Sequence, residues 1–486
     1  MFVRKVKSRK SVCFQIGLKQ AAKFVLVKHI GCGSTLSEIE ILRLKAQQEL
    51  IELKFKDQLS LFPQLKSNLK AKLVDWKITG FHQVFGSVYD LIGFPNNLLR
   101  DLVVARIIYP KSKLATIRYL NRYLGFNLTK DKVYRFMDNL SKEELTKTAL
   151  EFVLKKQKQA FLSLVFYDVT TLYFETDKED IFRRPGFSKD HKLNTPQILV
   201  GLFVDRQGYP FDFDFFPGNT FEGQTFQKAI NSLLKKHRFK TFTAVADAGM
   251  LSKDNLAFLS SLDLGYIVGA RLKSLSQALT HLVLNHDFGV KPALQLRLKN
   301  KRLIINYSSK RAKKDKANRD RLVKKLKIRL ESGQTVIRKS KYLKLKSPGK
   351  PTGIDENQVK ADSKFDGLKG YFTNTDLPVK QVIDQYSNLW RVEKAFRMSK
   401  TDLKERPIYH YQLQRIKAHL LICFVSLLVI KEAEAKLAKK DISLERAKEL
   451  LAKVGQGTIK IGKVTLETDS ELDQETQVIH KLFAGH

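Results

Sequence analysis

Apolar residues follow two different periods along this chain, and the change between them separates its regions. From about residue 80 to 160 the apolar positions recur at the spacing of a helix face, so a set of helices is expected there. Between 161 and 271 they form short runs bounded by turn residues, which is typical of strands. The predicted strands are 161–166, 198–204, 209–216, 242–246 and 266–269, with helices at 224–236 and 253–262.

This order of elements predicts an α/β fold. Three strands, a helix, a strand, a helix and a last strand follow one another, as in a ribonuclease H-like core with a mixed five-stranded sheet. After Arg271 the order is interrupted by an insertion, and it resumes near Gly370. The predicted division is an N-terminal strand and helix region (1–60), a helical domain (61–160), the first part of the core (161–271), an insertion domain (272–365), the second part of the core (366–435) and a C-terminal tail (436–486).

Two helices in the 61–160 domain are separated by a short turn. Residues 114–124 and 133–140 flank Gly125-Phe-Asn127, and Thr129 is placed to cap the second helix. The arrangement can be a helix-turn-helix whose second helix enters a DNA groove, which would make this domain a DNA-binding domain. A simple packed pair of helices explains the same pattern equally well.

The two ends of the chain show weaker patterns. Residues 1 to about 35 alternate basic and apolar residues, which indicates short strands. A helix is predicted over 37–61, where Ser37 and Glu40 have capping-box spacing. The tail is expected to form a helix, a short strand pair around Gly462 and a last helix.

Charge adds a partner to this picture. Lys and Arg total 88 against 49 Asp and Glu among 486 residues, so the net charge is +39. A chain this basic is expected to bind polyanions, because each neutralised phosphate releases condensed counterions. The charge alone does not distinguish nucleic acid from other anionic surfaces.

The cysteines and the most apolar run bear on location. Cys13, Cys32 and Cys423 show no CxxC spacing, and we expect reduced thiols in a cytoplasmic protein. No secretory signal is evident. The run 420–430 is too short to cross a bilayer and is expected to be a buried core helix of a soluble protein.

Three acids carry the candidate chemistry. Asp168 lies near the end of the first predicted core strand, Asp247 closes the fourth, and Glu393 lies on the later helix. Carboxylates placed in this way can hold two divalent cations, which activate water and stabilise the leaving oxygen in phosphodiester cleavage. We therefore predict a metal-dependent nuclease site.

The segment around Glu393 is expected to be one continuous helix. Tyr386, Glu393 and Lys400 are seven residues apart, so successive members differ by only roughly 20° around a helix and would form one column. The apolar residues Leu389, Val392 and Phe396 would anchor the neighbouring face to the sheet. An ordinary amphipathic helix with an incidental Glu is the alternative, and the two strand acids weigh against it.

These residues resemble a known family. Tyr386, Glu393 and Lys400 match three members of the Y-x2-R-x3-E-x6-K signature of DDE transposases in the IS-four superfamily of bacterial insertion sequences. The chain is similar to that group from about residue 1 to 435. Further motifs that fit are Tyr167-Asp-Val-Thr-Thr171, Gly186-Phe-Ser-Lys-Asp190, Pro217-Gly-Asn219, Ala246-Asp-Ala-Gly249 and Arg406-Pro-Ile-Tyr-His410.

The resemblance implies a mechanism and its residues. Asp168, Asp247 and Glu393 would bind two Mg2+ ions, with Mn2+ as a substitute, and the enzyme would cleave element ends and join the freed 3′-OH to target DNA. The phosphate-binding residues would be Tyr386, Arg391, Arg397 and Lys400. The partners implied are double-stranded DNA, with its terminal inverted repeats and target site, and a second copy of the chain in a synaptic dimer, in the bacterial cytoplasm at the nucleoid.

Two positions depart from the family pattern. The signature Arg falls on Leu389, so its phosphate contact would be lost or supplied by Arg391. Many relatives carry Arg after the second Asp, where this chain has Ala248. A decayed or domesticated DNA-binding relative, and a metal nuclease without strand transfer, are therefore kept as alternative functions.

Two further features allow more than one interpretation. Asp212 and Asp214 alternate with phenylalanines, so we expect them on the solvated face of a strand rather than at a metal. The basic run 310–325 is either a solvated helix face or a clamp on DNA. Neutralising Lys313, Lys314 and Lys316 separates those two, because a clamp residue contributes to the salt dependence of DNA affinity.

Overall fold

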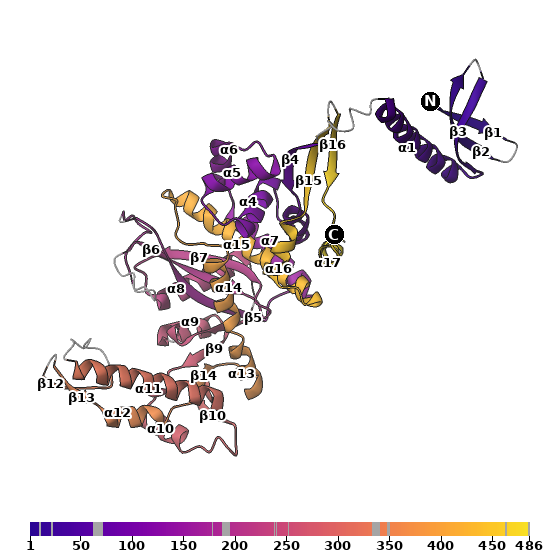
Figure 1. Cartoon of the computed structure of the whole chain (residues 1–486). Coiled ribbons are helices and arrows are strands. Elements are labelled where there is room, and N and C mark those ends of the chain that lie inside the picture. Colours follow the sequence, from indigo (N-terminus) through magenta and orange to yellow (C-terminus); the bar gives the residue numbers. More distant parts are fainter. Residues whose placement is uncertain are drawn as a thin grey trace. The chain divides into compact units, whose positions relative to one another are not determined.

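The structure is a computed structural model whose described residues are 1–8, 11–20, 23–61, 71–176, 178–186, 195–237, 239, 241–250, 252–332, 341–347, 350–461 and 464–484 (Figure 1). The chain forms two compact units. The first comprises Met1–Lys77 and Gly455–Ser470, and the second comprises Ile78–Val454 and Glu471–His486. Each unit is described by itself.

The first unit contains two small antiparallel sheets and a helix. Strands β1 (Phe2–Lys7), β2 (Val12–Gln20) and β3 (Lys23–Gly33) form a meander, as the alternating pattern predicts, and α1 (Leu36–Leu61) follows. The second sheet has the order β16-β15-β4, with β4 at Lys72–Ile78, β15 at Gly455–Ile461 and β16 at Val464–Asp469. The predicted strand pair in the tail is thus confirmed, while Gly462 itself lies outside the described residues.

The start of α1 is capped by residues other than those predicted. The N–H of Thr35 donates to Glu38 Oε2 over 3.2 Å, and the N–H of Glu38 donates back to Thr35 Oγ1 over 3.3 Å. The capping box is therefore Thr35 with Glu38, two residues earlier than Ser37 with Glu40. Both pairs have the same spacing in the sequence, and only the actual end of β3 decides between them.

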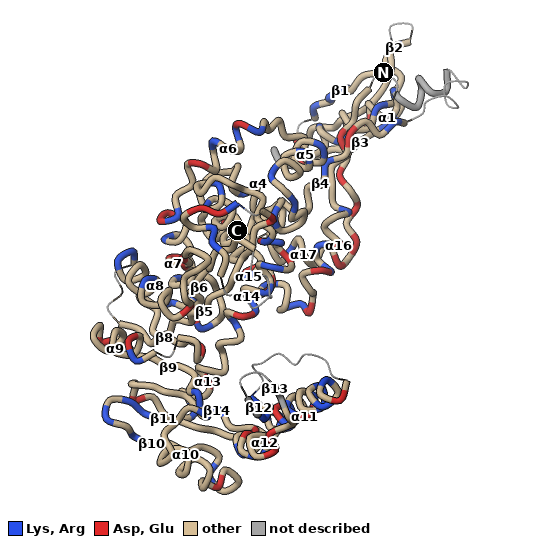
Figure 2. The backbone as a smooth tube through the Cα atoms, turned by 90° about the vertical axis from the view of Figure 1, so that its left-hand side faces the viewer, with Lys and Arg blue, Asp and Glu red and all other residues tan. Residues whose placement is uncertain are grey.

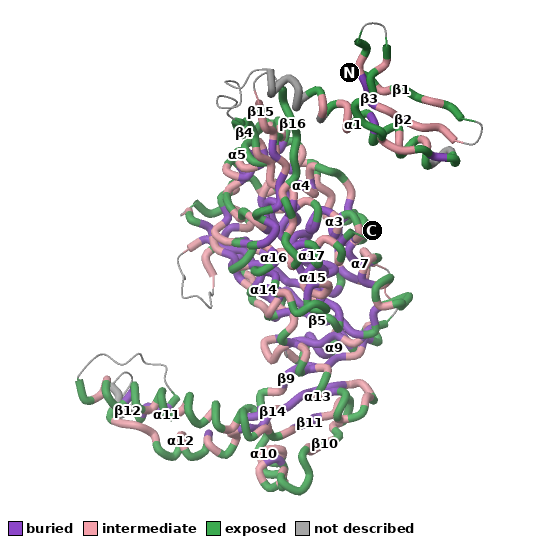
Figure 3. The backbone as a smooth tube through the Cα atoms, turned by 45° about the vertical axis from the view of Figure 1, so that its right-hand side comes forward, coloured by how far each residue is buried: buried purple, intermediate pink, exposed green. Residues whose placement is uncertain are grey.

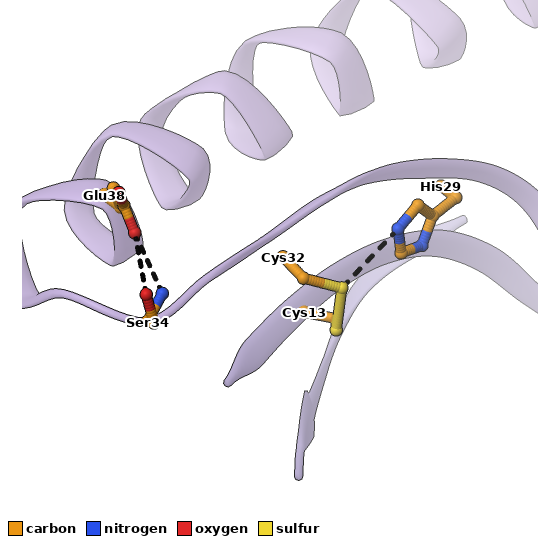
Figure 4. The surroundings of a disulfide bond; sticks show 5 residues. All are labelled: Cys13, His29, Cys32, Ser34 and Glu38. Atoms are coloured by element: carbon orange, nitrogen blue, oxygen red, sulfur yellow. Dashed lines mark hydrogen bonds between the residues drawn. A yellow bond between two sulfur atoms is a disulfide. The ribbon is translucent and has the colours of Figure 1, made fainter. Parts of the chain in front are cut away.

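Two cysteines pair in this unit, against the expectation of reduced thiols. Cys13 on β2 lies directly opposite Cys32 on β3, and their sulfurs form a disulfide (Figure 4). The Cys32 sulfur also lies 3.7 Å from His29 Nε2. Their separation of 19 residues in sequence gave no indication that the strands would align them. Cys423 is free and buried, as expected for a core thiol.

The second unit begins with helices. A short π-helix at His82–Gly86 leads into α3 (Ser87–Ile92). The helices that follow are α4 (Asn97–Ile108), α5 (Lys113–Leu124), α6 (Lys130–Asp138) and α7 (Lys142–Gln157). Gly125 ends α5 in the left-handed conformation at φ 68°, and Thr129 caps α6 by accepting from the N–H of Lys132. The predicted helix pair is confirmed. Its role in DNA binding stays a prediction, since α6 also packs against a long core helix, α15 (Leu413–Leu437).

A large mixed sheet forms the centre of this unit. Its order is β10-β11-β14-β9-β8-β5-β6-β7. The predicted strands are all present, as β5 (Leu164–Tyr173), β6 (Gln197–Val204), β7 (Pro210–Pro217), β8 (Thr243–Ala246) and β9 (Gly265–Ala270). The connecting helices are α8 (Glu222–His237) and α9 (Lys253–Ser261).

The sheet has eight strands rather than the expected five. The three additional strands are β10 (Ala293–Leu298), β11 (Lys301–Tyr307) and β14 (Leu368–Thr373), and β14 pairs with both β9 and β11. Two strands of the segment predicted as an insertion, β10 and β11, therefore continue the sheet, and β14 lies where the core was predicted to resume. The remaining elements there are α10 (Gln277–Leu284), α11 (Ser309–Glu331), β12 (Leu343–Ser347), β13 (Lys350–Ile354) and α12 (Glu356–Ser363).

Helices α13 (Val379–Ser387), α14 (Trp390–Thr401) and α15 complete the core, and α16 (Leu444–Leu451) and α17 (Gln474–Phe483) follow. Helix α15 is the one described helix long and apolar enough to span a membrane, but 78% of its apolar window is buried inside the protein. It packs against α4, α6, α14 and β7, and Figure 3 shows it as a buried stretch among the helices of this unit. This confirms a core helix, longer than the 420–430 run predicted.

Candidate active site

The sheet brings two of the three predicted acids level with each other. Strands β5 and β8 are parallel neighbours, with Phe166 opposite Val245. Two residues further along each chain lie Asp168 and Asp247. In adjacent parallel strands a common advance of two residues keeps the side chains level and on one face. Both acids are half-buried.

Local backbone groups hold both carboxylates. Asp168 Oδ1 accepts the N–H of Val169 over 2.8 Å, and Asp247 Oδ1 accepts the N–H of Gly249 over 2.8 Å. Hydrogen bonds from N–H groups stabilise the charged form of a carboxylate. Two oriented carboxylates therefore lie side by side. Asp247 directly follows β8, as predicted, but Asp168 lies in the middle of β5 rather than near its end, because β5 continues to Tyr173.

These acids face the helix layer that contains α14. Asp168 lies directly opposite Leu202 of β6, and Leu202 lines a small cavity with Phe396 of α14. Residues opposite each other in an antiparallel pair share a face. The next residue back, Tyr167, points the other way, and its hydroxyl lies 3.1 Å from Thr225 Oγ1 of α8.

Glu393 projects from α14, which packs against β5 and β6. The helix buries Val392, Phe396 and Met398, whereas Glu393 and Arg397 are exposed. The third acid thus lies on the element that covers the strand acids. Its exposed position leaves it short of a closed cluster: within the described part of the chain, no three His, Cys, Asp or Glu side chains are close enough to hold a metal ion.

The predicted continuous helix is broken. Tyr386 ends α13, and Glu393 lies on the separate helix α14. Between them the N–H groups of Asn388, Leu389 and Arg391 donate to carbonyls three residues back, at 3.1, 3.0 and 3.0 Å. Such a tighter turn redirects the chain, so the column of Tyr386, Glu393 and Lys400 is not a feature of one helix. The Asn388 side chain, which donates to the carbonyl of Asp384 over 3.0 Å, competes with regular helix at this point.

The break brings the Tyr386 hydroxyl back to the sheet. A Cβ placed on Gly269 of β9 would lie 2.4 Å from that oxygen and 3.2 Å from the amide nitrogen of Ala248, beside Asp247. Burial raises the pKa of Tyr386, and the negative charges of Asp247 and Glu393 raise it further. The phenol therefore lies within electrostatic reach of an acid from the sheet and the acid from α14.

Two basic residues near this point have no counterpart among the predicted site residues. Lys369 of β14 places its ammonium 4.6 Å from the centre of the Tyr386 ring. Burial and the neighbouring Arg311 of α11 lower the pKa of Lys369, while the charge of Glu393 acts in the opposite direction. Nothing in the sequence marked them, because Lys369 lies on a strand predicted as core and Arg311 in a long basic run.

The other predicted phosphate-binding residues have different surroundings. Arg391 packs on Gly208, and its guanidinium donates to the carbonyl of Gln207 over 3.2 Å. Arg397 is exposed and Lys400 half-buried on α14. Leu389, at the position of the signature Arg, is 5% exposed and belongs to the core. In the motif 186–190, Gly186 is described, and the rest lies outside the described residues.

Asp212 and Asp214 are not on a solvated face, contrary to expectation. Asp212 is fully buried and accepts from His237 Nε2 at 2.8 Å and from Lys236 Nζ at 3.1 Å, both near the end of α8. Asp214 pairs with Lys142 and lies 3.6 Å from Lys236. Alternation with Phe predicted the wrong exposure because both faces of this sheet are covered by helices.

The basic run 310–325 lies on α11. Arg319 pairs with Asp366, and Arg311 lies 3.4 Å from Asp315, while Lys313, Lys314 and Lys316 are exposed. The choice between a clamp and a solvated face stays open on these interactions. Figure 2 shows Lys and Arg along helices, strands and connections of both units, so basic residues are not confined to this run.

Comparison with known proteins bears on this site. No curated protein matches the chain. Among solved structures, a piggyBac transposase synaptic complex with hairpin DNA is 9% identical with a TM-score of 0.37, and 77% of this chain and 76% of that chain are covered. A Mos1 transposase paired-end complex is 15% identical with a TM-score of 0.16, and 37% of this chain and 57% of that chain are covered.

A family model also matches the sequence of the chain. The model of the transposase DDE domain matches residues 159–429, a span that contains β5, β8 and α14 with their three acids. The match extends over more than half of the 486 residues. The chain therefore belongs to the transposase DDE domain family.

Proposed function

We propose that this transposase cleaves DNA at the ends of an insertion sequence and joins the 3′-OH ends to target DNA. The observation that carries the proposal is the register of β5 and β8, which sets Asp168 level with Asp247 on the face covered by the helix of Glu393. Phosphodiester chemistry of this kind requires several oxygen ligands gathered at one point.

The sheet order supports a ribonuclease H-like core. Read from β7, the order is β7-β6-β5-β8-β9, or third, second, first, fourth and fifth in sequence. Strand β6 is antiparallel to β5, whereas β8 and β9 run parallel to it. The acids lie on the first and fourth strands of this core, where we place the catalytic centre.

Two Mg2+ ions, or Mn2+ in their place, would be held by Asp168, Asp247 and Glu393. This donor set fits hard cations, since all three groups are carboxylates. When bound, such ions supply an activated water and stabilise the leaving oxygen. Completing the ligand set requires the Glu393 side chain to turn toward the strand acids, which its exposed position on α14 permits.

The basic and phenolic groups would orient the DNA. Tyr386 and Lys400 would hold backbone phosphates beside the carboxylates, with Arg397 further along the exposed face of α14. Lys369 would be a further positioning residue, because its ammonium lies against the Tyr386 ring and the negative charge of Glu393 acts on its pKa. Arg391 remains a candidate, although part of its hydrogen-bonding capacity is used by Gln207.

The wider setting follows the resemblance in the signature residues. We place the protein in the IS-four superfamily, acting as a dimer on terminal inverted repeats at the bacterial nucleoid. The buried Leu389 means that the contact of the signature Arg must come from another residue or be absent.

A cleavage and joining assay tests the proposal. Element-end DNA is incubated with Mg2+ and the wild-type protein, Asp168→Asn, Glu393→Gln, or Asp376→Asn as a matched control from an exposed loop. We expect nicked ends and joined products from the wild type and the control, and uncut but bound DNA from the two site variants. Cutting without joining would favour a nuclease, binding without cutting by the wild type would favour a DNA-binding relative, and full cleavage by Asp168→Asn would refute the site.

A further inference from the structure

A second concave site lies away from the three acids. It is a pocket of about 560 Å³ bounded by the end of α4, the start of α5 and the connection that follows α14. Its lining contributes five cationic side chains and no carboxylate, the cations being Arg106, Lys111, Lys113, Lys404 and Arg406. Two histidines, His410 and His419, and the hydroxyl-bearing Ser112 and Tyr409 complete the polar lining.

Lys113 is the unusual member of this group. It is the first residue of α5 and is only 3% exposed, yet no hydrogen bond or ion pair is found for its ammonium within the described residues. Burial, with a contribution from the charge of Arg106, moves the pKa of Lys113 well below its ordinary value. Buried lysines are normally paired, so a buried lysine that lacks a counter-charge and lines a pocket is placed to receive an anion.

The neighbouring groups cannot supply that anion. Arg106 is 5% exposed, donates to the carbonyl of Leu403 over 3.4 Å and lies 3.4 Å from His419 Nδ1. Because a guanidinium only donates, His419 carries its proton on Nε2, which donates to the carbonyl of Glu405 over 3.0 Å. His419 is therefore held in its neutral form and adds no negative charge.

The acid that precedes Arg406 in the chain is hydrogen-bonded away from the pocket. Glu405 is 6% exposed and its carboxylate accepts from the Ser399 hydroxyl over 2.6 Å. It does not line the pocket, and burial raises its pKa. His410 does line the pocket, and burial together with the charges of Lys113 and Arg106 lowers its pKa to about 3. No carboxylate is thus found among the residues that line the pocket, and none of the described acids forms an ion pair with Lys113.

The start of α5 adds a second favourable element. Ser112 caps this 12-residue helix by accepting the N–H of Ala115, so the unpaired N–H groups of the first turn open beside Lys113. Helix N-termini favour anions through these groups and through the helix dipole. Here that terminus coincides with a buried ammonium and a lined pocket.

The pocket also lies along the strand that carries Asp168. Phe174, next after β5, forms a bridge with Ile408, and the Arg406 guanidinium lies 5.1 Å from the centre of the Tyr173 ring. Tyr173 is five residues beyond Asp168, which corresponds to roughly 16 Å along a strand. A DNA backbone that passes the acids at that distance can reach this connection.

We propose that the pocket lined by Lys113, Arg106 and Arg406 binds a phosphate group of the DNA backbone. This rests on the proposed function for the identity of the polymer, but the phosphate chemistry itself does not. A free phosphate ion shares that chemistry, so the test must separate the two sources.

The first arm uses inorganic phosphate and no DNA. Thermal unfolding of the full-length protein is followed with increasing phosphate, against chloride at matched ionic strength, for the wild type, Lys113→Met and the control Arg118→Gln, an exposed residue of α5 outside the pocket. Phosphate should raise the Tm of the wild type and of Arg118→Gln but not of Lys113→Met. In chloride, Lys113→Met should itself unfold roughly 2 °C higher, because an unpaired buried charge has been removed.

The second arm measures affinity for duplex DNA in EDTA, so that cleavage plays no part. A backbone contact predicts that Lys113→Met binds on the order of tenfold more weakly on any sequence, with the salt slope reduced by about 1. Loss of the phosphate response with unchanged DNA affinity would assign the pocket to free phosphate and overturn the backbone contact.

The outcome that overturns the site is a lower Tm for Lys113→Met with an unchanged phosphate response, as for a lysine of purely structural role. If that variant does not fold, Lys111→Gln with Lys404→Gln, both exposed at the rim, replaces it. An undiminished phosphate response in that double variant likewise refutes the site. Failure of the cleavage assay alone would count against the proposed function and leave the phosphate arm standing.

Discussion

Two pairs of aspartates on opposite faces of one sheet differ in the groups that interact with their carboxylates. Asp212 and Asp214 of β7 lie on the side of α8, where Asp212 is fully buried against Lys236 and His237. Asp168 and Asp247 lie on the side of α14 and are half-buried, each held by a backbone N–H. A carboxylate compensated by cations of the fold stabilises that fold, whereas a half-buried one held by a backbone N–H is placed to receive a ligand.

The largest expected effect is on the presented pair. Asp247→Asn should reduce DNA cleavage by roughly a thousandfold or more, because a carboxylate ligand is lost. Folding should be little affected, since the Asn side chain can still accept the N–H of Gly249. Plasmid nicking and thermal unfolding measured on the same preparation check both statements. A strongly lowered Tm would indicate instead that Asp247 stabilises the fold.

The compensated pair should respond in the opposite way. Asp212→Asn leaves Lys236 and His237 beside a neutral group, and we expect the free energy of unfolding to fall by about 3–5 kcal/mol. Cleavage per folded molecule should persist. Urea denaturation measures the first quantity, and activity normalised to the folded fraction measures the second.

The stability contributed by Asp212 should depend on pH. Burial raises the pKa of Asp212, but the hydrogen bond from His237 and the charges of Lys236 and Lys142 outweigh it, so the pKa is lowered overall. The stabilisation from Asp212 is then fully present above the pKa of the unfolded chain, about 3.9, and is lost as the pH falls through the lower folded value. Unfolding free energies of wild type and Asp212→Asn should therefore converge as the pH is lowered from 6 toward 3, and parallel curves would contradict the assignment.

The smallest expected effect concerns Gly269, which allows the Tyr386 hydroxyl to approach β9 near the amide of Ala248, the residue after Asp247. A methyl group there would meet the Tyr386 oxygen at 2.4 Å, so Gly269→Ala should destabilise the protein by about 1–3 kcal/mol and displace the phenol. In a Tyr386→Phe background the loss should be smaller, because the clashing oxygen is gone. A double-mutant cycle by denaturation gives the interaction energy. An additive result would show that the two residues do not meet.

The sequence predicted those structural features, the strands and their order, that depend on local periodicity. Strands β5 to β9 and their order are confirmed, because short apolar runs between turn residues identify buried strands. Asp247 directly follows β8, as predicted, whereas Asp168 lies in the middle of β5, which continues to Tyr173. The alignment of the two acids follows from β5 and β8 being parallel neighbours, which the ribonuclease H-like order implied.

What escaped prediction depends on tertiary structure. The prediction of one continuous helix through Asn388 was wrong, because one side-chain hydrogen bond and a tight turn outweigh an unbroken amphipathic pattern. The burial of Asp212 and the pairing of Cys13 with Cys32 depend on partners distant in sequence. Lys113 and Lys369 look like ordinary surface lysines until the fold buries them.

The return of β14 to the side of β9 has a consequence for how this chain can change. Deleting the excursion between β9 and α13 would remove β10, β11 and β14 and leave β9 as a bare edge with unpaired N–H and C=O groups. Such an edge invites pairing with other chains. Variants shortened there should therefore self-associate rather than persist as trimmed monomers. Length variation is better tolerated between β11 and β14, where α11, β12, β13 and α12 lie outside the eight-stranded sheet.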